Sequence, residues 1–293
     1  MQYKNVSQIY SLLNNSPVES LNLFSPKQSI IVDVKRDDLI HSVISGNKWR
    51  KLKHLLLKIE KEGFKKIATM AGPYSNFAHA LSYICYLLGW QCDLYIRGYI
   101  EQTKTPTLID CEKWKANIYF VNRNKFRELR EKKPSLANDV FWIPEGGLHR
   151  QSLYGLKELL MECYRQYDYI VTASATGTSV AGLMEAAVIY QPYAKIIGIS
   201  VLNNVSQQNK DIALLTKQKN GTLIEEYQFG GFAKADLALE KLITNFYQQY
   251  KIPLEPIYNG KSFFAVKDLI EQGYFKDHSR ILIIHCGGLQ GLR

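Results

Sequence analysis

Short apolar segments alternate with amphipathic segments along most of this chain. The apolar segments are rich in β-branched and aromatic residues, which is typical of strands. In the segments between them, apolar residues recur at helical spacing, as Trp49, Leu52, Leu56 and Ile59 do. This alternation predicts an α/β fold with parallel sheets covered by helices and with functional residues at the carboxyl ends of strands. The predicted strands are 66–70, 92–96, 117–121, 140–143, 169–172, 195–201 and 280–285; the predicted helices are 48–62, 77–88, 107–115, 125–131, 153–164, 179–189, 235–250 and 262–272.

The length of 293 residues and the hydrophobic content of 46% allow one large domain or two smaller ones. The chain contains no internal repeat and no linker rich in proline or serine. Any boundary between domains is therefore expected to be a place where the chain crosses from one sheet to another.

Composition argues against several classes of function. The net charge is +10, but without an arginine-rich run or a basic-aromatic motif we expect no nucleic-acid partner. Five scattered cysteines argue against a disulfide framework, and six histidines lack metal-ligand spacing, so no metal is expected. The first ten residues are too polar for a signal peptide, and no apolar run approaches the ~18 residues that span a bilayer. A soluble, cytoplasmic protein is expected.

Lys48 lies where a helix is predicted to begin, with Asn47 as its cap. A lysine that attacks an aldehyde must be neutral, and lowering its pKa to near neutrality costs about 4 kcal/mol of differential solvation. The positive end of a helix dipole favours such a shift. The alternative is an ordinary basic helix, with Lys48, Lys51 and Lys58 along one solvated stripe.

Other loops of small and polar residues stand between predicted strands and helices. The segment 172–179 is rich in hydroxyl groups and opens a helix, which is typical of a phosphate site, although it matches neither a Walker A loop nor GxGxxG. Ser75 and Asn76 follow the strand 66–70 in the same way. Each segment alone could be a simple capped turn. Further turns of this kind are 145–147, 257–262 and 285–288, and we expect these loops to meet at one end of a parallel sheet.

Taken together, these segments resemble the family of pyridoxal-phosphate (PLP) enzymes that contains 1-aminocyclopropane-1-carboxylate (ACC) deaminase and D-cysteine desulfhydrase. The matches run in family order from about Asp33 to Leu292. They are GNKxRKL at 46–52, the Ser-Asn loop at 75–76, the IPxGG-like turn at 143–147, the phosphate loop at 173–179, YxGKS at 258–262 and HxGG at 285–288.

The resemblance implies a fold of the tryptophan synthase β type, fold type II, with two domains and PLP in the cleft between them. Residues 1–46 and 148–293 would form the larger PLP-binding domain and residues 47–147 a smaller inserted α/β domain. The family also implies a homodimer and a small amino acid as the substrate.

The resemblance also assigns roles to residues. Lys48 would carry PLP, Asn76 would bind the cofactor's phenolic oxygen, and Ser75 would hold the substrate carboxylate or act as a nucleophile. Tyr258 would stack near the ring or assist proton transfer. The remaining cofactor-binding residues would be Thr176, Gly177, Thr178 and Ser179 at the phosphate, with Asn259 and Cys286 beside the ring.

Four positions depart from the family pattern. Asn259 replaces the glutamate that faces the pyridine nitrogen in ACC deaminases, and Cys286 stands where they have leucine and the desulfhydrases have threonine. Phe232 and Phe77 replace a tyrosine and a histidine or glutamine. A neutral Asn cannot keep the pyridinium protonated, which weakens PLP as an electron sink and favours elimination of a good leaving group.

Three functions follow from these observations. The first is a PLP-dependent lyase that eliminates sulfide from D-cysteine to give pyruvate and ammonia. The second is ACC deamination to 2-oxobutanoate and ammonia. The third is a PLP-binding protein without catalysis, in which Phe77 and Phe232 mark lost chemistry.

Overall fold

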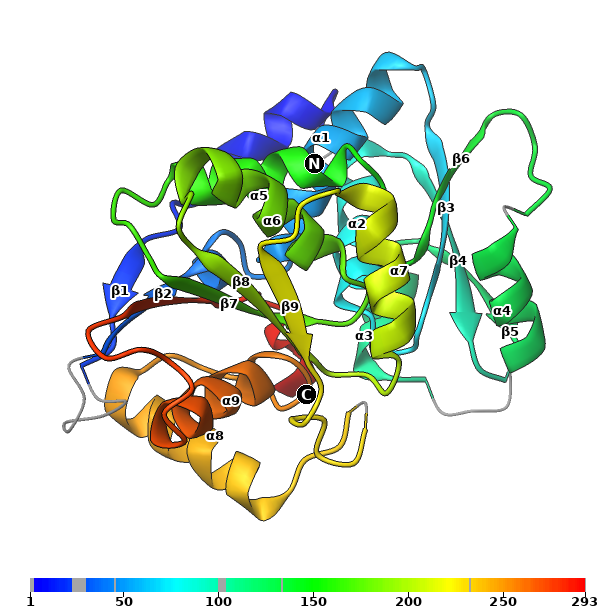
Figure 1. Ribbon diagram of the computed structural model, residues 1–293. Helices are drawn as coiled ribbons and strands as arrows, with labels where there is room; N and C mark the ends of the chain where they lie inside the picture. Colours follow the sequence, from blue (N-terminus) through cyan, green and yellow to red (C-terminus); the bar gives the residue numbers. More distant parts are fainter. Residues whose placement is uncertain are drawn as a thin grey trace.

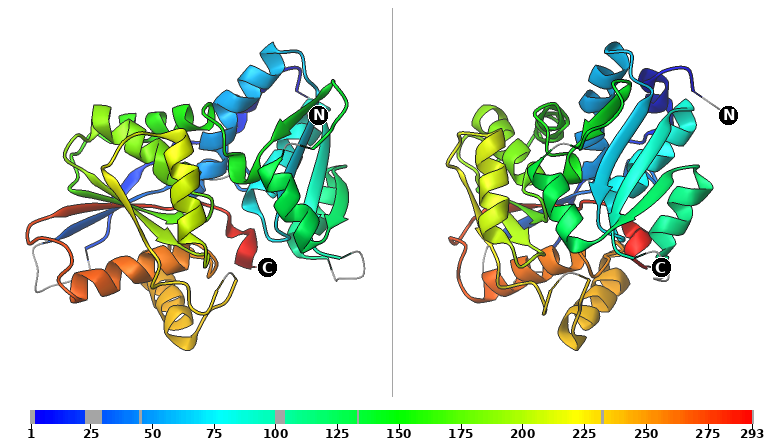
Figure 2. Two further views of the ribbon diagram at one scale, coloured as in Figure 1. Left: turned by 45° about the vertical axis from the view of Figure 1, so that its right-hand side comes forward. Right: turned by 90° about the vertical axis from the view of Figure 1, so that its right-hand side faces the viewer.

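The computed structural model describes residues 3–22, 30–44, 46–99, 104–132, 134–231 and 233–292. The chain forms two sheets, each covered by helices, which lie side by side as two lobes (Figures 1 and 2). The larger sheet is parallel except for its first edge strand, which runs antiparallel to its neighbour. Its strands, in spatial order, are β1 (Val18–Ser20), β2 (Ile31–Lys35), β10 (Arg280–Ile284), β7 (Tyr169–Ser174), β8 (Lys195–Ser200) and β9 (Gly221–Ile224).

The smaller sheet is parallel throughout. Its strands, in spatial order, are β5 (Asn117–Val121), β4 (Gln91–Arg97), β3 (Lys66–Ala71) and β6 (Val140–Ile143). The chain leaves the larger sheet after β2 and returns to it after β6. The two lobes are thus joined by chain crossings, as the lack of a flexible linker predicted, and the α/β class with mostly parallel sheets is confirmed.

Helices cover both faces of the larger sheet because its central strands are apolar on both sides. In β7, Ile170 packs in one core, whereas Tyr169 and Val171 point to the other. The first core is closed by α5 (Ser152–Met161), α6 (Thr178–Tyr190) and α7 (Val205–Leu215), and the second by α8 (Leu237–Tyr250) and α9 (Asn259–Glu271).

The smaller sheet is covered unequally. One face packs against α1 (Asn47–Lys61), α2 (Asn76–Leu88) and α3 (Pro106–Lys113), and this core also takes in Val6, Ile9, Ile40 and Ile44. The other face packs against α4 (Arg123–Glu131) through Phe126 and Leu129. The proposed division into residues 1–46 with 148–293 and residues 47–147 stays a prediction.

Several predicted boundaries are wrong. The cap of α1 is Gly46, because Asn47 is already helical. The helix α5 ends three residues earlier than predicted, and α9 begins at Asn259, three residues before the predicted start, because Glu255 satisfies the backbone N–H groups there. The weakly patterned elements β1, β2, β9 and α7 were not predicted. Within the described residues, no helix has the length and apolar character that a membrane crossing requires.

Candidate active site

A cavity of about 430 Å³ lies between the two sheets. The segments after β3, β6, β7 and β10 and the first turns of α1, α2 and α6 contribute to its wall. Predicted site residues from distant parts of the chain meet there, whereas Thr178 and Asn259 do not line the cavity. Those that line it are Lys48, Ser75, Asn76, Thr176, Gly177, Ser179, Tyr258 and Cys286.

The start of α1 places Lys48 against the end of β10. Gly46 has φ +68°, and a Cβ on it would lie 1.7 Å from the carbonyl oxygen of Cys286, so only glycine fits this approach. Arg50 anchors the same helix, since its guanidinium donates hydrogen bonds to Asp37 at 2.9 Å and to Glu162 at 2.7 Å. The spacing of the GNKxRKL segment therefore combines a close approach, a cavity lysine and an anchor.

Lys48 is buried, and its Nζ donates to the carbonyl oxygen of Cys286 at 3.0 Å. Nζ also lies 5.7 Å from the centre of the Tyr258 ring. Burial lowers the pKa of Lys48. Burial and the nearby Lys48 lower the pKa of Lys51 to about 7. A solvated lysine stripe is thus wrong for these two residues: they line the cavity, and burial disfavours the charged form of each amine.

The first turn of α6 has a geometry that is typical of an anion site. Its cap is Gly177, with φ +76°, which has no side chain to accept from the first N–H groups of the helix. By contrast, Asn122 caps α4 by accepting from Lys125 N at 2.9 Å. The Thr176 and Thr178 hydroxyls lie 3.3 Å apart at the same loop. The loop therefore offers backbone and hydroxyl donors to an anion.

A buried network that sequence reasoning missed supports this loop from behind. Ser174 donates to the Oε1 of Gln208 at 2.7 Å, and the amide nitrogen of Gln208 donates to Ser200 (2.6 Å) and Asn204 (2.9 Å). Gln208 is fully buried on α7, a helix that the periodicity did not reveal. No local sequence pattern could have revealed that Gln208 supports this loop, because the role depends on contacts between segments that are distant in sequence.

Ser75 and Asn76 begin α2 at the edge of the cavity. Ser75 caps the helix by accepting from Ala78 N at 3.2 Å, which leaves its hydroxyl proton available as a donor. The Oδ1 of Asn76 accepts from Gln290, whereas its buried Nδ2 has no hydrogen-bond partner among the described residues. A Cβ on Gly288 would lie 2.1 Å from this Nδ2 and 3.2 Å from Lys48 Nζ. The amide and the lysine thus point to the same space.

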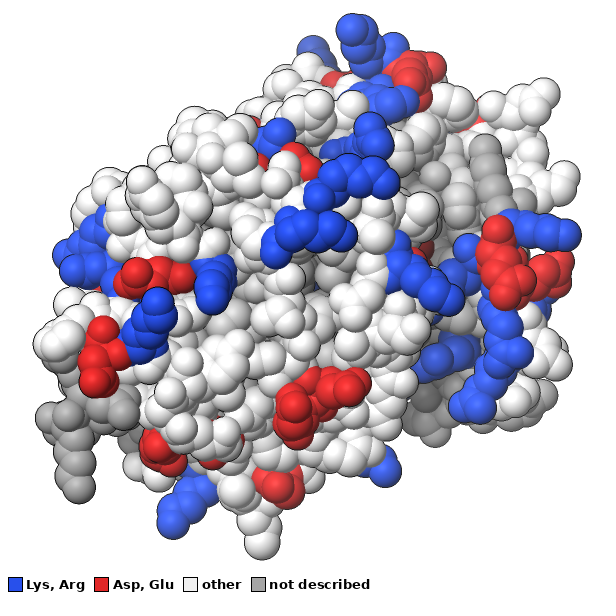
Figure 3. Space-filling view, viewed as in Figure 1, with Lys and Arg blue, Asp and Glu red and all other residues white. Residues whose placement is uncertain are grey.

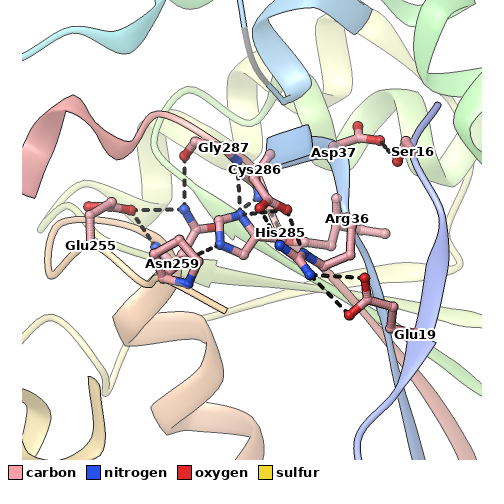
Figure 4. A network of polar contacts seen from close by, with 12 residues as sticks. Ser16, Glu19, Arg36, Asp37, Glu255, Asn259, His285, Cys286 and Gly287 are labelled. Atoms are coloured by element: carbon pink, nitrogen blue, oxygen red, sulfur yellow. Dashed lines mark hydrogen bonds and ion pairs between the residues drawn. The ribbon is translucent and has the colours of Figure 1, made fainter. Parts of the chain in front are cut away.

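The start of α9 holds Asn259 behind the cavity wall. Its Nδ2 donates to Glu255 at 3.0 Å and to the carbonyl oxygen of Gly287 at 2.9 Å, and its Oδ1 accepts from Cys286 N at 2.7 Å (Figure 4). Glu255 is fully buried and also accepts from the backbone N–H groups of Ile257, Tyr258 and Asn259. Burial raises the pKa of Glu255. This carboxylate, which sequence reasoning missed, fixes both Tyr258 and Asn259.

The remaining positions of the motifs have structural contacts. Lys261 is buried and donates to the carbonyl oxygens of Gln228 and Gly231, both at 2.8 Å, so it does not serve the cavity. Phe77 lines the cavity. Phe232 and Ser45 lie outside the described residues.

The wall on the side of the smaller sheet carries four arginines that sequence reasoning did not single out. They are Arg97 at the end of β4 and Arg123, Arg127 and Arg130 on α4. Arg130 pairs with Glu145 (3.2 Å) on the η3 turn (Glu145–Gly147) and with Asp211 (3.5 Å) on α7, which links the two lobes. In the sequence, Arg123, Arg127 and Arg130 are spaced by four and three residues, which places them on one helix face. An ordinary solvated helix face has the same spacing, so the sequence did not reveal their position at the cavity.

A phosphorylated aldehyde fits these residues. The buried amine of Lys48 suits the aldehyde, the first turn of α6 suits the phosphate, and the unpartnered Nδ2 of Asn76 suits a ring oxygen. An enzyme with its cofactor between two α/β lobes is the class that this fold and cavity define. A family model described as pyridoxal-phosphate-dependent enzyme matches residues 9–287, and the chain belongs to this family.

Individual relatives cover nearly the whole chain. A Thermotoga maritima protein, provisionally named as an ACC deaminase, is 26% identical over 96% of both chains. A D-cysteine desulfhydrase from Serratia proteamaculans is 23% identical over 94% of this chain and 92% of its own. The crystal structure of an ACC deaminase homologue is similar with a TM-score of 0.78 and 26% identity, covering 99% of this chain and 96% of that one.

Proposed function

We propose that this PLP-dependent enzyme is a lyase that releases ammonia from a small amino acid by β-elimination, with D-cysteine as the leading substrate. The observation that carries the proposal is the position of Lys48. Its amine is buried on the cavity, donates to a carbonyl rather than a carboxylate, and has a lowered pKa because of burial. When bound, PLP withdraws electrons from the Cα of an attached amino acid.

Lys48 has two roles in this proposal. Its amine would hold the cofactor covalently, and the same amine would serve as the base that takes the proton from Cα of the substrate. Both roles require the neutral amine, and burial favours that form. Tyr258, 5.7 Å from Nζ, lies close enough to pack against a ring bound there. Burial raises its pKa, so its hydroxyl stays protonated and can donate.

The two sides of the cavity orient the bound groups. The first turn of α6, with Thr176 and Ser179, would hold the phosphate, and the free Nδ2 of Asn76 would donate to the phenolic oxygen. The Ser75 hydroxyl, fixed at the cap of α2, would donate to the substrate carboxylate. Thr178 would act through its backbone N–H at the same turn, since its side chain does not line the cavity.

Asn259 supports elimination over ring opening. Both amide protons are already donated, to Glu255 and Gly287, and the side chain carries no charge. In the resemblance, a glutamate at this position faces the ring nitrogen of ACC deaminases. Without that negative charge PLP would be a weaker electron sink, which suits a substrate with a good leaving group. Cys286 contributes packing here: its Sγ lies 3.3 Å from the Thr172 hydroxyl, and burial raises its pKa.

ACC deamination is the second candidate, and the provisional names of several relatives favour it. The third, a binding protein without catalysis, rests on Phe77 at the cavity wall in place of a polar residue. The three candidates share the cofactor and differ in the product that they release.

The deciding experiment measures ammonia release by the PLP-loaded protein from D-cysteine, L-cysteine and ACC side by side. Release from D-cysteine but not ACC is the expected result. Release from ACC with none from cysteine would show that the charge at the ring nitrogen does not select the reaction. If none of the three compounds releases ammonia, but borohydride reduction links PLP covalently to Lys48, the protein binds the cofactor without catalysis.

Three further properties belong to the proposal. The division into residues 1–46 with 148–293 and 47–147 is supported by the two sheets. A homodimer is supported by exposed apolar side chains on neighbouring ends of α5 and α6, among them Met161 (60% exposed) and Ile189 (60%). A cytoplasmic location is supported by five buried free cysteines.

A further inference from the structure

The charges of the cavity wall are unbalanced. Among the described residues that line it, six are lysine or arginine and one, Glu145, is acidic. The phosphate of PLP would be held at α6 on the opposite side. Figure 3 shows basic side chains gathered over α4 and over the space between α4 and α7. The excess of positive charge therefore lies on the α4 side, away from the phosphate loop.

Two of the arginines, Arg123 and Arg127, have no acidic partner among the described residues. Within the described part of the chain, no ion pair or side-chain hydrogen bond involves Arg123 or Arg127. Arg97 lies over the Phe126 ring at 5.6 Å, and its charge also acts on the Glu145 carboxyl. Phe126 is buried and lines the same cavity, which keeps Arg97 at its rim. Arg130, in contrast, is neutralised by Glu145 and Asp211. The guanidinium groups of Arg123 and Arg127 are thus available to a ligand, and that of Arg97 is so in part.

The arrangement works against the stability of α4. Arg123 is the first residue of the helix, where the dipole disfavours a positive charge, and the first turn contains no acidic residue. Arg123 and Arg127 are four residues apart, so their charges repel each other on one face. The acidic residue Glu128 pairs instead with Lys125 on the outer face. Folding alone gives no reason to gather these arginines at the cavity.

We propose that Arg97, Arg123 and Arg127 form a binding site for a second anionic group of the substrate, beyond its α-carboxylate. The inference rests on the proposed function. It narrows the substrate class to amino acids whose β-substituent is anionic, such as a phosphate or sulfate ester. The thiolate of cysteine is the smallest substituent of this kind. Guanidinium groups recognise phosphate and sulfate oxygens by paired hydrogen bonds.

The chemistry of such a substrate is balanced with water as the one further reactant. Lys48 takes the proton from Cα, and the electron pair of that bond forms the Cα–Cβ double bond. The bond from Cβ to the ester oxygen breaks, and the leaving group departs with its electron pair as free phosphate or sulfate. Water then hydrolyses the released enamine to pyruvate and ammonia. Arginines at the leaving group would stabilise the charge that develops there, which compensates for the neutral Asn259.

The test compares O-phosphoserine with O-acetylserine, whose β-substituent is neutral, using both enantiomers of each on the PLP-loaded protein. In the double variant Arg123→Gln/Arg127→Gln we expect kcat/KM for O-phosphoserine to fall by about 10- to 100-fold, mainly through KM, because charge-assisted hydrogen bonds are lost. Turnover of O-acetylserine should change less than about twofold. Arg150→Gln, an exposed arginine outside the cavity wall, is the matched control.

Binding gives a readout that does not depend on turnover. Calorimetric titration of O-phosphoserine should show the same loss of affinity in the double variant, and inorganic phosphate should compete with it. Equal losses for both amino acids would overturn the inference, as would weaker PLP binding without a change in selectivity, which would assign the arginines to the cofactor. If no amino acid is turned over but O-phosphoserine binding depends on the arginines, the proposed lyase activity is wrong and the proposed anion site is supported.

Discussion

The wall of the cavity at α6 and the wall at α4 both face anions but are built differently. At α6 the donors are backbone N–H groups and hydroxyls, and Gln208 supports their loop through three hydrogen bonds, two of them buried. At α4 the donors are arginine side chains that are exposed and, for Arg123 and Arg127, unpartnered among the described residues. The α6 wall is therefore organised before any ligand binds, as suits a resident cofactor. The α4 wall, with its exposed side chains, can adapt to the ligand that binds there.

Lys48 stands between the two walls, and its loss should have the largest effect. Lys48→Ala is expected to reduce ammonia release by at least about 1000-fold, because both the attachment point and the base are removed. Mass spectrometry after borohydride treatment should show no covalent PLP. Lys58→Ala, on the outer part of the same helix, should retain both properties. Turnover that survives the loss of Lys48 would assign the chemistry to another group.

The rigid wall should fail when its glycine is replaced. In Gly177→Ala the new Cβ would lie 2.7 Å from Ile212 at a φ of +76°, so we expect a loss of about 1–3 kcal/mol in stability and weaker PLP binding. Gly63→Ala has the same sign of φ (+82°) and no atom within 4 Å of the new Cβ, so it should cost less and leave PLP affinity unchanged. Equal PLP affinity in both variants would contradict the phosphate assignment.

Lys51 allows the electrostatics between the walls to be tested by pH. Its folded pKa is lowered to about 7, so the unfolded chain binds more protons between pH 7 and the unfolded pKa. The stability of the cofactor-free protein should therefore rise with pH over this window, by about 2 kcal/mol between about pH 7 and pH 9. Lys51→Met should flatten the rise in urea unfolding experiments. A rise that persists unchanged in the variant would mean that Lys51 is charged in the folded state.

Salt should have the smallest effect and should separate the two walls. Raising NaCl from about 0.05 M to about 0.5 M screens exposed charges and is expected to raise KM for an anionic substrate several-fold. The affinity for PLP should change less, because α6 presents buried donors. Fluorescence titration of PLP and initial rates, measured in the same buffers, provide the comparison. If salt weakens the affinity for PLP more than it raises KM for the substrate, the cofactor phosphate would be assigned to the α4 wall instead of the α6 wall.

The amino-acid sequence by itself determined the α/β class, the order of most elements and the family. Strand and helix periodicities are local properties, and motifs such as GNKxRKL keep their spacing because Gly46, Lys48 and Arg50 each have a fixed task over a few residues. The edge strands β1 and β9 and the helix α7 escaped prediction because their patterns are short or weak and contacts with neighbouring segments stabilise them.

Only the tertiary structure decided which polar residues share the cavity. Asn259 was expected beside the cofactor ring but donates to Glu255 and Gly287, while Gln208 and Glu255 were overlooked although they hold the site in place. The arginines of α4 have the same local pattern as a solvated face, and they acquire a role because the chain crosses between two sheets and brings that face to the cavity. Contacts between segments far apart in sequence leave no local periodicity, so the folded arrangement alone reveals them.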